Sequence, residues 1–153
     1  MRLPLCICVA AALATATQAG AKIIVQRGIA GVELQMTKAQ VRAKLGRPMR
    51  VRTGTNEFGT FRELVYRRVT VTFQSGPQVT NVRTTSPLER TGRDIGVGST
   101  KAQVMARVHN VHCVNESGFR HCFVGQFLPG RKVTDFRLRN GRVSSVSIGF
   151  VID

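Results

Sequence analysis

Two cysteines in the second half of the chain each follow a histidine, as His112-Cys113 and His121-Cys122. Thiolates and imidazoles bind zinc, and two thiols can instead join in a disulfide. Neighbouring residues on a strand point to opposite faces, so these four side chains do not converge easily on one ion, and the chain has no C-x-x-C spacing. The sequence therefore predicts a Cys113–Cys122 disulfide across a hairpin and no metal site.

The chain lacks the usual sequence signatures of catalysis. Neither G-x-S-x-G nor H-E-x-x-H is present. Cys6 and Cys8 lie in the predicted signal peptide, so pairing of Cys113 with Cys122 leaves the mature chain without a free nucleophilic thiol. The eight acidic residues share no motif that indicates a general acid/base pair. We therefore predict that the protein is not an enzyme and has no cofactor.

A glycine-containing segment, Gly96 to Lys101, leads into a predicted helix. It does not match the G-x-x-x-x-G-K-[ST] loop of nucleotide-binding proteins. Two interpretations stay open at this point: an anion-binding nest of backbone N–H groups, or a flexible linker followed by a helix cap.

Two helices are predicted by a segment that occurs twice. Thr37-Lys38-Ala39-Gln40-Val41 recurs as Thr100-Lys101-Ala102-Gln103-Val104, and weaker matches follow at a similar offset. The T-x-x-Q spacing is that of a capping box, in which the Thr hydroxyl and the Gln amide satisfy backbone N–H groups of the first turn. Helices this short are not stable alone, so each must pack on another element.

The remaining sequence alternates in the manner of antiparallel strands. Val69, Val71 and Phe73 alternate with polar residues, as do Phe136 and Leu138, and Asn140-Gly141 is a strong hairpin turn. This alternation places one set of polar side chains on the solvent face of a sheet. We predict that they form a binding site: Thr70, Thr72, Arg137, Arg139, Ser145 and Ser147.

The chain is predicted to have three segments. A signal peptide over 1–21 precedes a first helix/sheet repeat over 22–88 and a second repeat with the disulfide over 89–153. The segment Pro87–Gly98 is expected to be the linker. Each repeat alone would bury too little surface to be stable, so we expect the two to share one core. The predicted fold class is α+β, with two tandem helix-plus-antiparallel-sheet repeats forming one sheet and the helices on one face.

The N-terminus has the pattern of a secretory signal peptide. Arg2 precedes an apolar run from Leu5 to Ala16, and small residues then allow cleavage near Ala19 or Ala21. The run is too short to span a bilayer. We therefore expect a secreted protein, or a periplasmic or other cell-envelope protein, without an integral membrane span.

The charge is strongly positive, with 23 Lys and Arg against 8 Asp and Glu and a net charge of +15. Two interpretations of this charge are open. The positive field attracts polyanions and so serves binding, or the arginine content reflects coding bias alone and has no function. No nucleic-acid-binding motif is present, and export argues against a genomic target. We expect an acidic protein or an anionic envelope component as the partner and no nucleic acid, and the oligomeric state stays open.

The segment from Leu34 to Pro48, LQMTKAQVRAKLGRP, resembles the helix motif G-M-T-x-x-Q-V-x-x-x-L-G-x-P. That motif marks the SmpA/OmlA family (the BamE-like assembly lipoproteins) and the β-lactamase inhibitory proteins, whose tandem repeats present a concave sheet to a secreted enzyme. Gln35 replaces the usual Gly, no cysteine stands at the cleavage site for lipidation, and only the second repeat contains a candidate disulfide. The resemblance implies a fold rather than an activity.

Together these features predict a secreted, non-catalytic module that binds a protein or envelope partner through an open sheet face. Two alternatives remain. One is a proteinaceous inhibitor of a secreted enzyme, and the other is a peripheral envelope protein that binds anionic lipid or polymer through charge.

Overall fold

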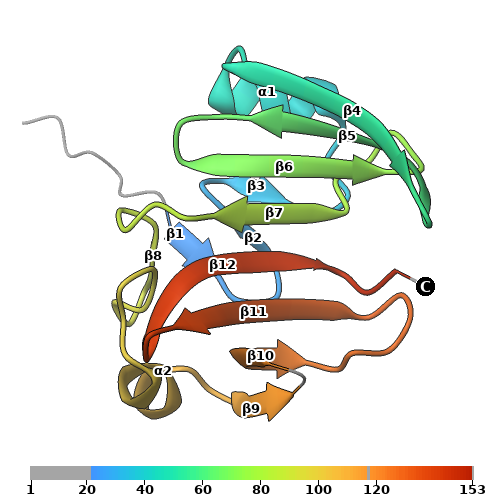
Figure 1. Ribbon diagram of the computed structural model, residues 1–153. Helices are drawn as coiled ribbons and strands as arrows, with labels where there is room; N and C mark the ends of the chain where they lie inside the picture. Colours follow the sequence, from blue (N-terminus) through green and yellow to red (C-terminus); the bar gives the residue numbers. More distant parts are fainter. Residues whose placement is uncertain (1–21, 117, 153) are drawn as a thin grey trace, which may run out of the picture.

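The computed structural model describes residues 22–116 and 118–152, whose strands form two sheets (Figure 1). The larger sheet has eight antiparallel strands, in spatial order β4 (Arg50–Asn56), β5 (Gly59–Val65), β6 (Val69–Gln74), β7 (Asn81–Thr84), β12 (Arg142–Phe150), β11 (Lys132–Arg139), β10 (Phe119–Gly125) and β9 (His112–Glu116). The smaller sheet has four strands, in the order β3 (Val32–Glu33), β2 (Gly28–Ile29), β1 (Lys22–Ile24) and β8 (Arg90–Thr91).

Two short helices begin at the predicted capping boxes. Helix α1 (Lys38–Leu45) follows Thr37, and α2 (Lys101–Arg107) follows Thr100. In each, the Thr hydroxyl accepts from the backbone N–H of the Gln three residues on, and the Gln side chain accepts from the Thr backbone N–H. The predicted helix starts are therefore confirmed. Neither helix of the described residues is long and apolar enough to cross a membrane.

The predicted hairpin at Asn140-Gly141 is also confirmed. It joins β11 to β12, and both residues have positive φ, 52° at Asn140 and 74° at Gly141. Asn and Gly are the residues that adopt this conformation at least cost. The turn therefore fixes the central hairpin of the larger sheet.

One hydrophobic core lies on a single side of the larger sheet. Alternate strand residues point into it, among them Leu64, Val71, Val82, Phe136 and Ile148. The smaller sheet, drawn behind the larger one in Figure 1, contributes Ile23, Ile29 and Val32, while α1 and α2 contribute Val41 and Val104. We call the core side the inner face of the larger sheet and the opposite side its outer face.

The predicted α+β class is wrong, and so is the predicted single sheet with helices on one face. The described residues are mostly strand, and α1 and α2 contribute only 8 and 7 residues. Helices this short cannot cover an eight-stranded sheet. The segment from Lys22 to Glu33 covers much of its inner face instead, and it does so as strands of a second sheet.

Part of the predicted linker Pro87–Gly98 forms a strand. It contains β8, where Lys22 and Ile23 of β1 pair in parallel with Arg90 and Thr91. The predicted signal peptide, residues 1–21, lies outside the described residues. The predicted boundaries between the repeats stay predictions.

Candidate functional site

The outer face of the larger sheet carries a continuous row of polar and aromatic side chains. Residues directly opposite each other in a sheet point to the same side, so the pairing register defines the row. It crosses six strands from β6 to β9 through Thr70, Arg83, Ser147, Asp135, Phe123 and His112. No helix of the described residues packs over this row (Figure 1).

One end of the outer face carries four ring side chains, His112, His121, Phe123 and Phe127, which we call the aromatic cluster. The Phe123 ring lies 4.8 Å from Phe127, 5.4 Å from His121 and 5.8 Å from His112, measured between ring centroids. Phe127 is 51% exposed, and Phe119 beside the cluster is 54% exposed. Exposed rings gathered on a sheet face form an apolar surface without a partner in the chain.

The disulfide explains why the rings face outward. Cys113 and Cys122 are direct cross-strand partners in β9 and β10, and their bond is confirmed, with Cys122 fully buried in the core. The residues next to two inward-facing cysteines must point outward. His112 and Phe123 are such neighbours, and they form a cross-strand pair.

A carboxylate anchors the aromatic cluster to β11. Asp135 Oδ1 lies 2.6 Å from His121 Nδ1, and both side chains are largely buried. Burial raises the pKa of the Asp135 carboxyl above its ordinary value, while the hydrogen bond from His121 opposes that rise. This pair fixes the orientation of the imidazole, whose ring lies 5.5 Å from that of Phe127.

Beside the aromatic cluster lies a hollow of about 540 Å³, which we call the arginine hollow. Its lining includes Arg83, Arg120, Arg137, Arg139, Phe119 and Ser144, and it contains no acidic residue. The Arg137 guanidinium carbon lies 4.9 Å from the centre of the Phe119 ring, within the range of a cation–π contact. None of the ion pairs among the described residues involves these four arginines.

The predicted binding residues do not all reach one site. Arg137 and Arg139 line the arginine hollow, whereas Thr70 and Thr72 line a separate hollow of about 480 Å³ further along the outer face. Ser147 is half-buried beside Asp135.

Ser145 lies opposite Arg137 and therefore on the outer face, but it is only 5% exposed and offers little surface to a partner. A register shift at Arg137/Leu138 places Ser144 and Ser145 beside a single position of β11. Ser144 is the residue that lines the arginine hollow.

Sequence reasoning missed the aromatic cluster and Arg83. The signal for the cluster was present, since Phe119, His121 and Phe123 alternate with the inward-facing Cys122. Arg83 follows the buried Val82 in β7, and a period-two pattern there assigns it to the outer face. A four-residue strand is too short for that pattern to be recognised alone.

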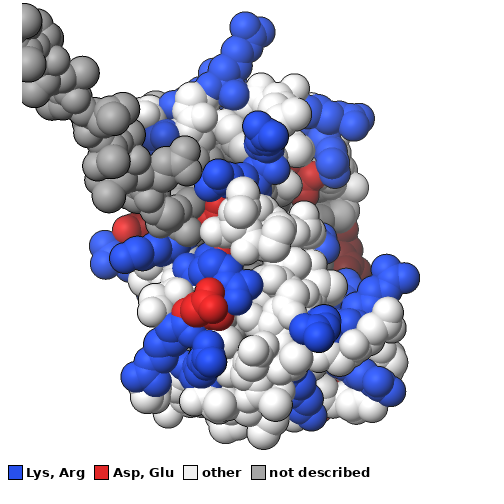
Figure 2. Space-filling view, turned by 90° about the vertical axis from the view of Figure 1, so that its left-hand side faces the viewer, with Lys and Arg blue, Asp and Glu red and all other residues white. Residues whose placement is uncertain are grey.

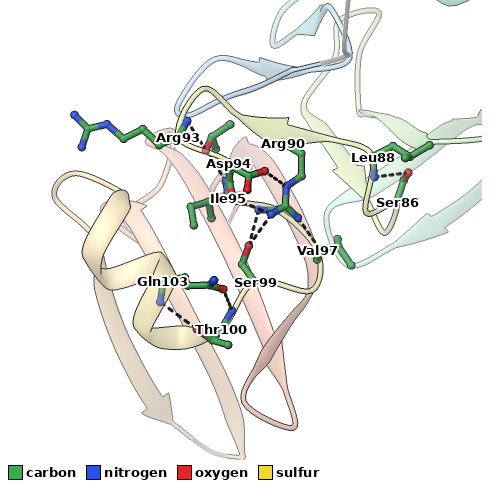
Figure 3. Close-up of polar contacts among 12 residues, drawn as sticks. Ser86, Leu88, Arg90, Arg93, Asp94, Ile95, Val97, Ser99, Thr100 and Gln103 are labelled. Carbon is green, nitrogen blue, oxygen red and sulfur yellow. Dashed lines mark hydrogen bonds and ion pairs between the residues drawn. The ribbon is translucent and has the colours of Figure 1, made fainter.

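The Gly96–Lys101 segment is not an anion-binding nest. Figure 3 shows Arg90 reaching across it: the Arg90 guanidinium donates to Asp94, to the Val97 carbonyl and to Ser99. The backbone N–H groups of Gly98, Ser99 and Lys101 donate to carbonyl oxygens within the protein. The segment is therefore a structural loop held by Arg90.

Basic side chains on another side of the molecule are dispersed. Figure 2 shows Lys and Arg scattered over that side among uncharged residues, with few acidic groups. Over residues 22–116 and 118–152, no group of three His, Cys, Asp or Glu side chains is placed to hold a metal ion.

A further hollow, of about 670 Å³, opens on the inner face beside the start of α1. Its lining includes Thr37, Lys38, Thr53, Arg62 and Phe73. It is separated from the aromatic cluster by the width of the sheet (Figure 1).

No protein-family model and no curated protein matches the chain. Among solved structures, it is similar to an extracellular protein containing an SCP domain from Bacillus anthracis, with a TM-score of 0.52 and 9% identity over 76% of this chain and 44% of that one. It also aligns with a DUF4309 family protein (YjgB) from Bacillus subtilis (TM-score 0.47, 16% identity, 74% of this chain and 78% of that one). A cysteine-rich secretory protein (SAV1118) from Staphylococcus aureus aligns with a TM-score of 0.48 and 11% identity, over 76% of this chain and 44% of that one.

The similarity to the Bacillus anthracis protein concerns the fold alone, and this chain spans less than half of that protein's length. None of the three structures is described as a β-lactamase inhibitory protein or an assembly lipoprotein. The resemblance of the Leu34–Pro48 motif to those families therefore stays a prediction.

Proposed function

We propose that the protein is an exported, non-catalytic binding module that holds a partner protein on the outer face of its larger sheet. The observation that carries the proposal is the aromatic cluster with Phe119, exposed on a strand face next to arginines that have no acidic partner. Aromatic residues and arginine are the side chains enriched in protein interfaces, where they supply most of the binding energy.

The side chains of the aromatic cluster are held in place before any partner binds. Its rings are held by contacts with one another, and the imidazole of His121 is fixed by Asp135. A surface whose side chains are already ordered loses less conformational entropy when a partner binds. His112, His121 and Phe123 lie on the two strands that the disulfide joins, so the backbone that carries these three rings is also restrained.

Export is supported by the N-terminal signal pattern and by the disulfide. Disulfides persist in oxidising compartments and are rare in the cytosol. The structure from Bacillus anthracis that shares the fold is described as an extracellular protein. The resemblance to the β-lactamase inhibitory proteins makes a secreted enzyme one candidate partner, which would then be inhibited in a stoichiometric complex.

The test is capture by the immobilised protein beginning at Lys22, with its disulfide intact. Envelope and culture-medium fractions of the producing organism are applied at low and at high salt. We expect one protein to be retained at both salt concentrations, because apolar contacts are not screened by salt. Retention should be lost in the double variant Phe119→Ser/Phe127→Ser.

The matched control is Met49→Ser/Leu88→Ser, which removes two apolar side chains that are 76% and 61% exposed outside the aromatic cluster. This control should retain the partner. Retention that survives the Phe119/Phe127 change, or no retained protein at all, would overturn the proposal. Capture of lipids or polyanions alone, lost at high salt, would instead favour a peripheral envelope protein.

A further inference from the structure

The arginine hollow is a site of unbalanced positive charge on the outer face. Four arginines line it, of which Arg83, Arg137 and Arg139 lie on the outer face by register, and no acidic residue lines it. Four other arginines of the described chain form ion pairs with acids: Arg27, Arg52, Arg68 and Arg90. Like charges held close together repel one another, so an anion that enters the hollow relieves this repulsion.

One of the arginines that line the hollow is held in position by an aromatic ring. Arg137 packs over the Phe119 ring, which holds it in position without neutralising it. The acidic side chain nearest along β11, Asp135, interacts with Arg137 by charge but forms no ion pair with it, and its hydrogen bond goes to His121. Arg137 is therefore available to an anion from outside the chain.

The spacing of the arginines fits an extended peptide. Arg137 and Arg139 are two residues apart on one face of β11, which separates them by about 7 Å. Alternate side chains of a partner strand repeat at the same distance. Guanidinium groups bind carboxylates through two parallel hydrogen bonds, so two arginines at this spacing match two acidic residues at alternate positions.

We propose that the arginine hollow binds the carboxylates of an acidic, extended segment of the partner protein, with Asp or Glu at alternate positions. The inference rests on the proposed function in one respect, namely that the partner is a protein. The adjoining aromatic cluster favours a peptide, because it offers apolar contacts next to the charge. Phe119 borders both surfaces and joins them into one site.

The test uses a defined probe and does not depend on capture of a natural partner. The probe is a capped peptide of alternating Glu and Ser, and its comparison peptide has the same composition with all Glu residues adjacent. Binding is measured by isothermal titration at low salt. We expect the alternating peptide to bind at least fivefold more tightly than the comparison peptide.

The variant Arg137→Gln/Arg139→Gln should weaken binding of the alternating peptide at least tenfold. The matched control is Arg42→Gln/Arg107→Gln, which removes the same charge from exposed positions on α1 and α2. This control should bind within twofold of the unmodified protein. Thermal unfolding of both variants verifies that each one is folded.

Equal losses in both variants would overturn the inference, because the net charge alone would then explain binding. Inorganic phosphate or vesicles of anionic phospholipid that bind through Arg137 and Arg139 more tightly than the peptide would also overturn it. The two proposals fail separately. Peptide binding without any captured protein contradicts only the proposed function, whereas partner capture that depends on Phe119 but not on Arg137 and Arg139 contradicts only this inference.

Discussion

Cys113 and Cys122 are direct cross-strand partners whose Cα atoms lie 4.0 Å apart, with Cys122 in the core and the aromatic cluster on the opposite side of the same two strands. The bond joins the edge strand β9 to β10, so it restrains the strands that hold His112 and Phe123. A covalent link on the inner face thereby restrains the two strands that carry the aromatic cluster on the outer face.

Replacing both cysteines by alanine should lower the free energy of unfolding by about 2–4 kcal/mol, as expected for a loop of this length. Urea denaturation under oxidising conditions measures the loss. Reductant should destabilise the unmodified protein by a similar amount and leave the variant unchanged. A variant that responds to reductant, or an unmodified protein that does not, would contradict the structural role of the bond.

The His121–Asp135 pair predicts a pH-dependent stability. Burial raises the pKa of Asp135, so the folded protein binds this proton more tightly than the unfolded chain does. A group with a raised pKa stabilises the fold at low pH, and that contribution is lost as the pH rises through the folded-state pKa. Asparagine at this position does not titrate.

The unmodified protein should therefore gain stability relative to Asp135→Asn as the pH falls from 7 to about 4, near the unfolded pKa of Asp. Urea titrations at several pH values measure the difference. It should be larger when both proteins also carry His121→Gln, because the hydrogen bond that lowers the pKa is then absent. A difference that shrinks toward low pH would show that the pKa of Asp135 is lowered instead.

The two capping boxes predict matched losses of stability. Thr37 and Thr100 each accept from a Gln backbone N–H, at 3.3 and 3.2 Å. Alanine at either position should cost about 1 kcal/mol, and the double variant should lose the sum because the caps lie on separate helices. Chemical denaturation measures each loss. Serine at either position retains the hydroxyl, so a serine variant as unstable as the alanine one would exclude the cap as the cause.

The sequence predicts the helix starts and hairpin turns of this fold, but not the second sheet that packs on the first. The helix starts follow from T-x-x-Q, and the β11–β12 hairpin follows from Asn140-Gly141, because both depend on neighbouring residues. Strands of two or three residues, such as β1, β2 and β8, are too short to show a period of two. Their pairing joins Lys22 to Arg90, so it depends on tertiary packing that no local pattern reports.

The candidate site could be predicted from the sequence on strands β9, β10 and β11. Arg137 and Arg139 were found because alternation in β11 is regular, and the cross-strand cysteines already implied that Phe123 faces outward. Ser145 is on the outer face, opposite Arg137, but it is nearly buried, and the register shift next to it places Ser144 at the arginine hollow. Exposure next to a bulge depends on which residue is displaced, and the residue types alone do not determine that.

A second carboxylate, Glu89, is buried in the connection between β7 and β8. Its side chain is 0% exposed, and neither carboxylate oxygen has a hydrogen-bond partner among the described residues. Arg68 Nη1 lies 3.5 Å from Glu89 Oε1, with the Arg68 side chain 44% exposed. Burial raises the pKa of Glu89, and Arg68 partly opposes that rise.

This pair predicts an asymmetric mutant cycle at pH 7. Arg68→Ala leaves a buried charge without compensation and should cost about 2 kcal/mol, less than for a fully buried pair because Arg68 is partly hydrated. Glu89→Gln removes the charge and keeps the shape, so it should cost less than about 1 kcal/mol. In the Glu89→Gln background the Arg68→Ala change should be nearly neutral, because no buried charge then remains to be compensated. Urea denaturation of the four proteins measures the coupling, and equal costs of Arg68→Ala in both backgrounds would mean that Arg68 contributes through packing rather than through charge.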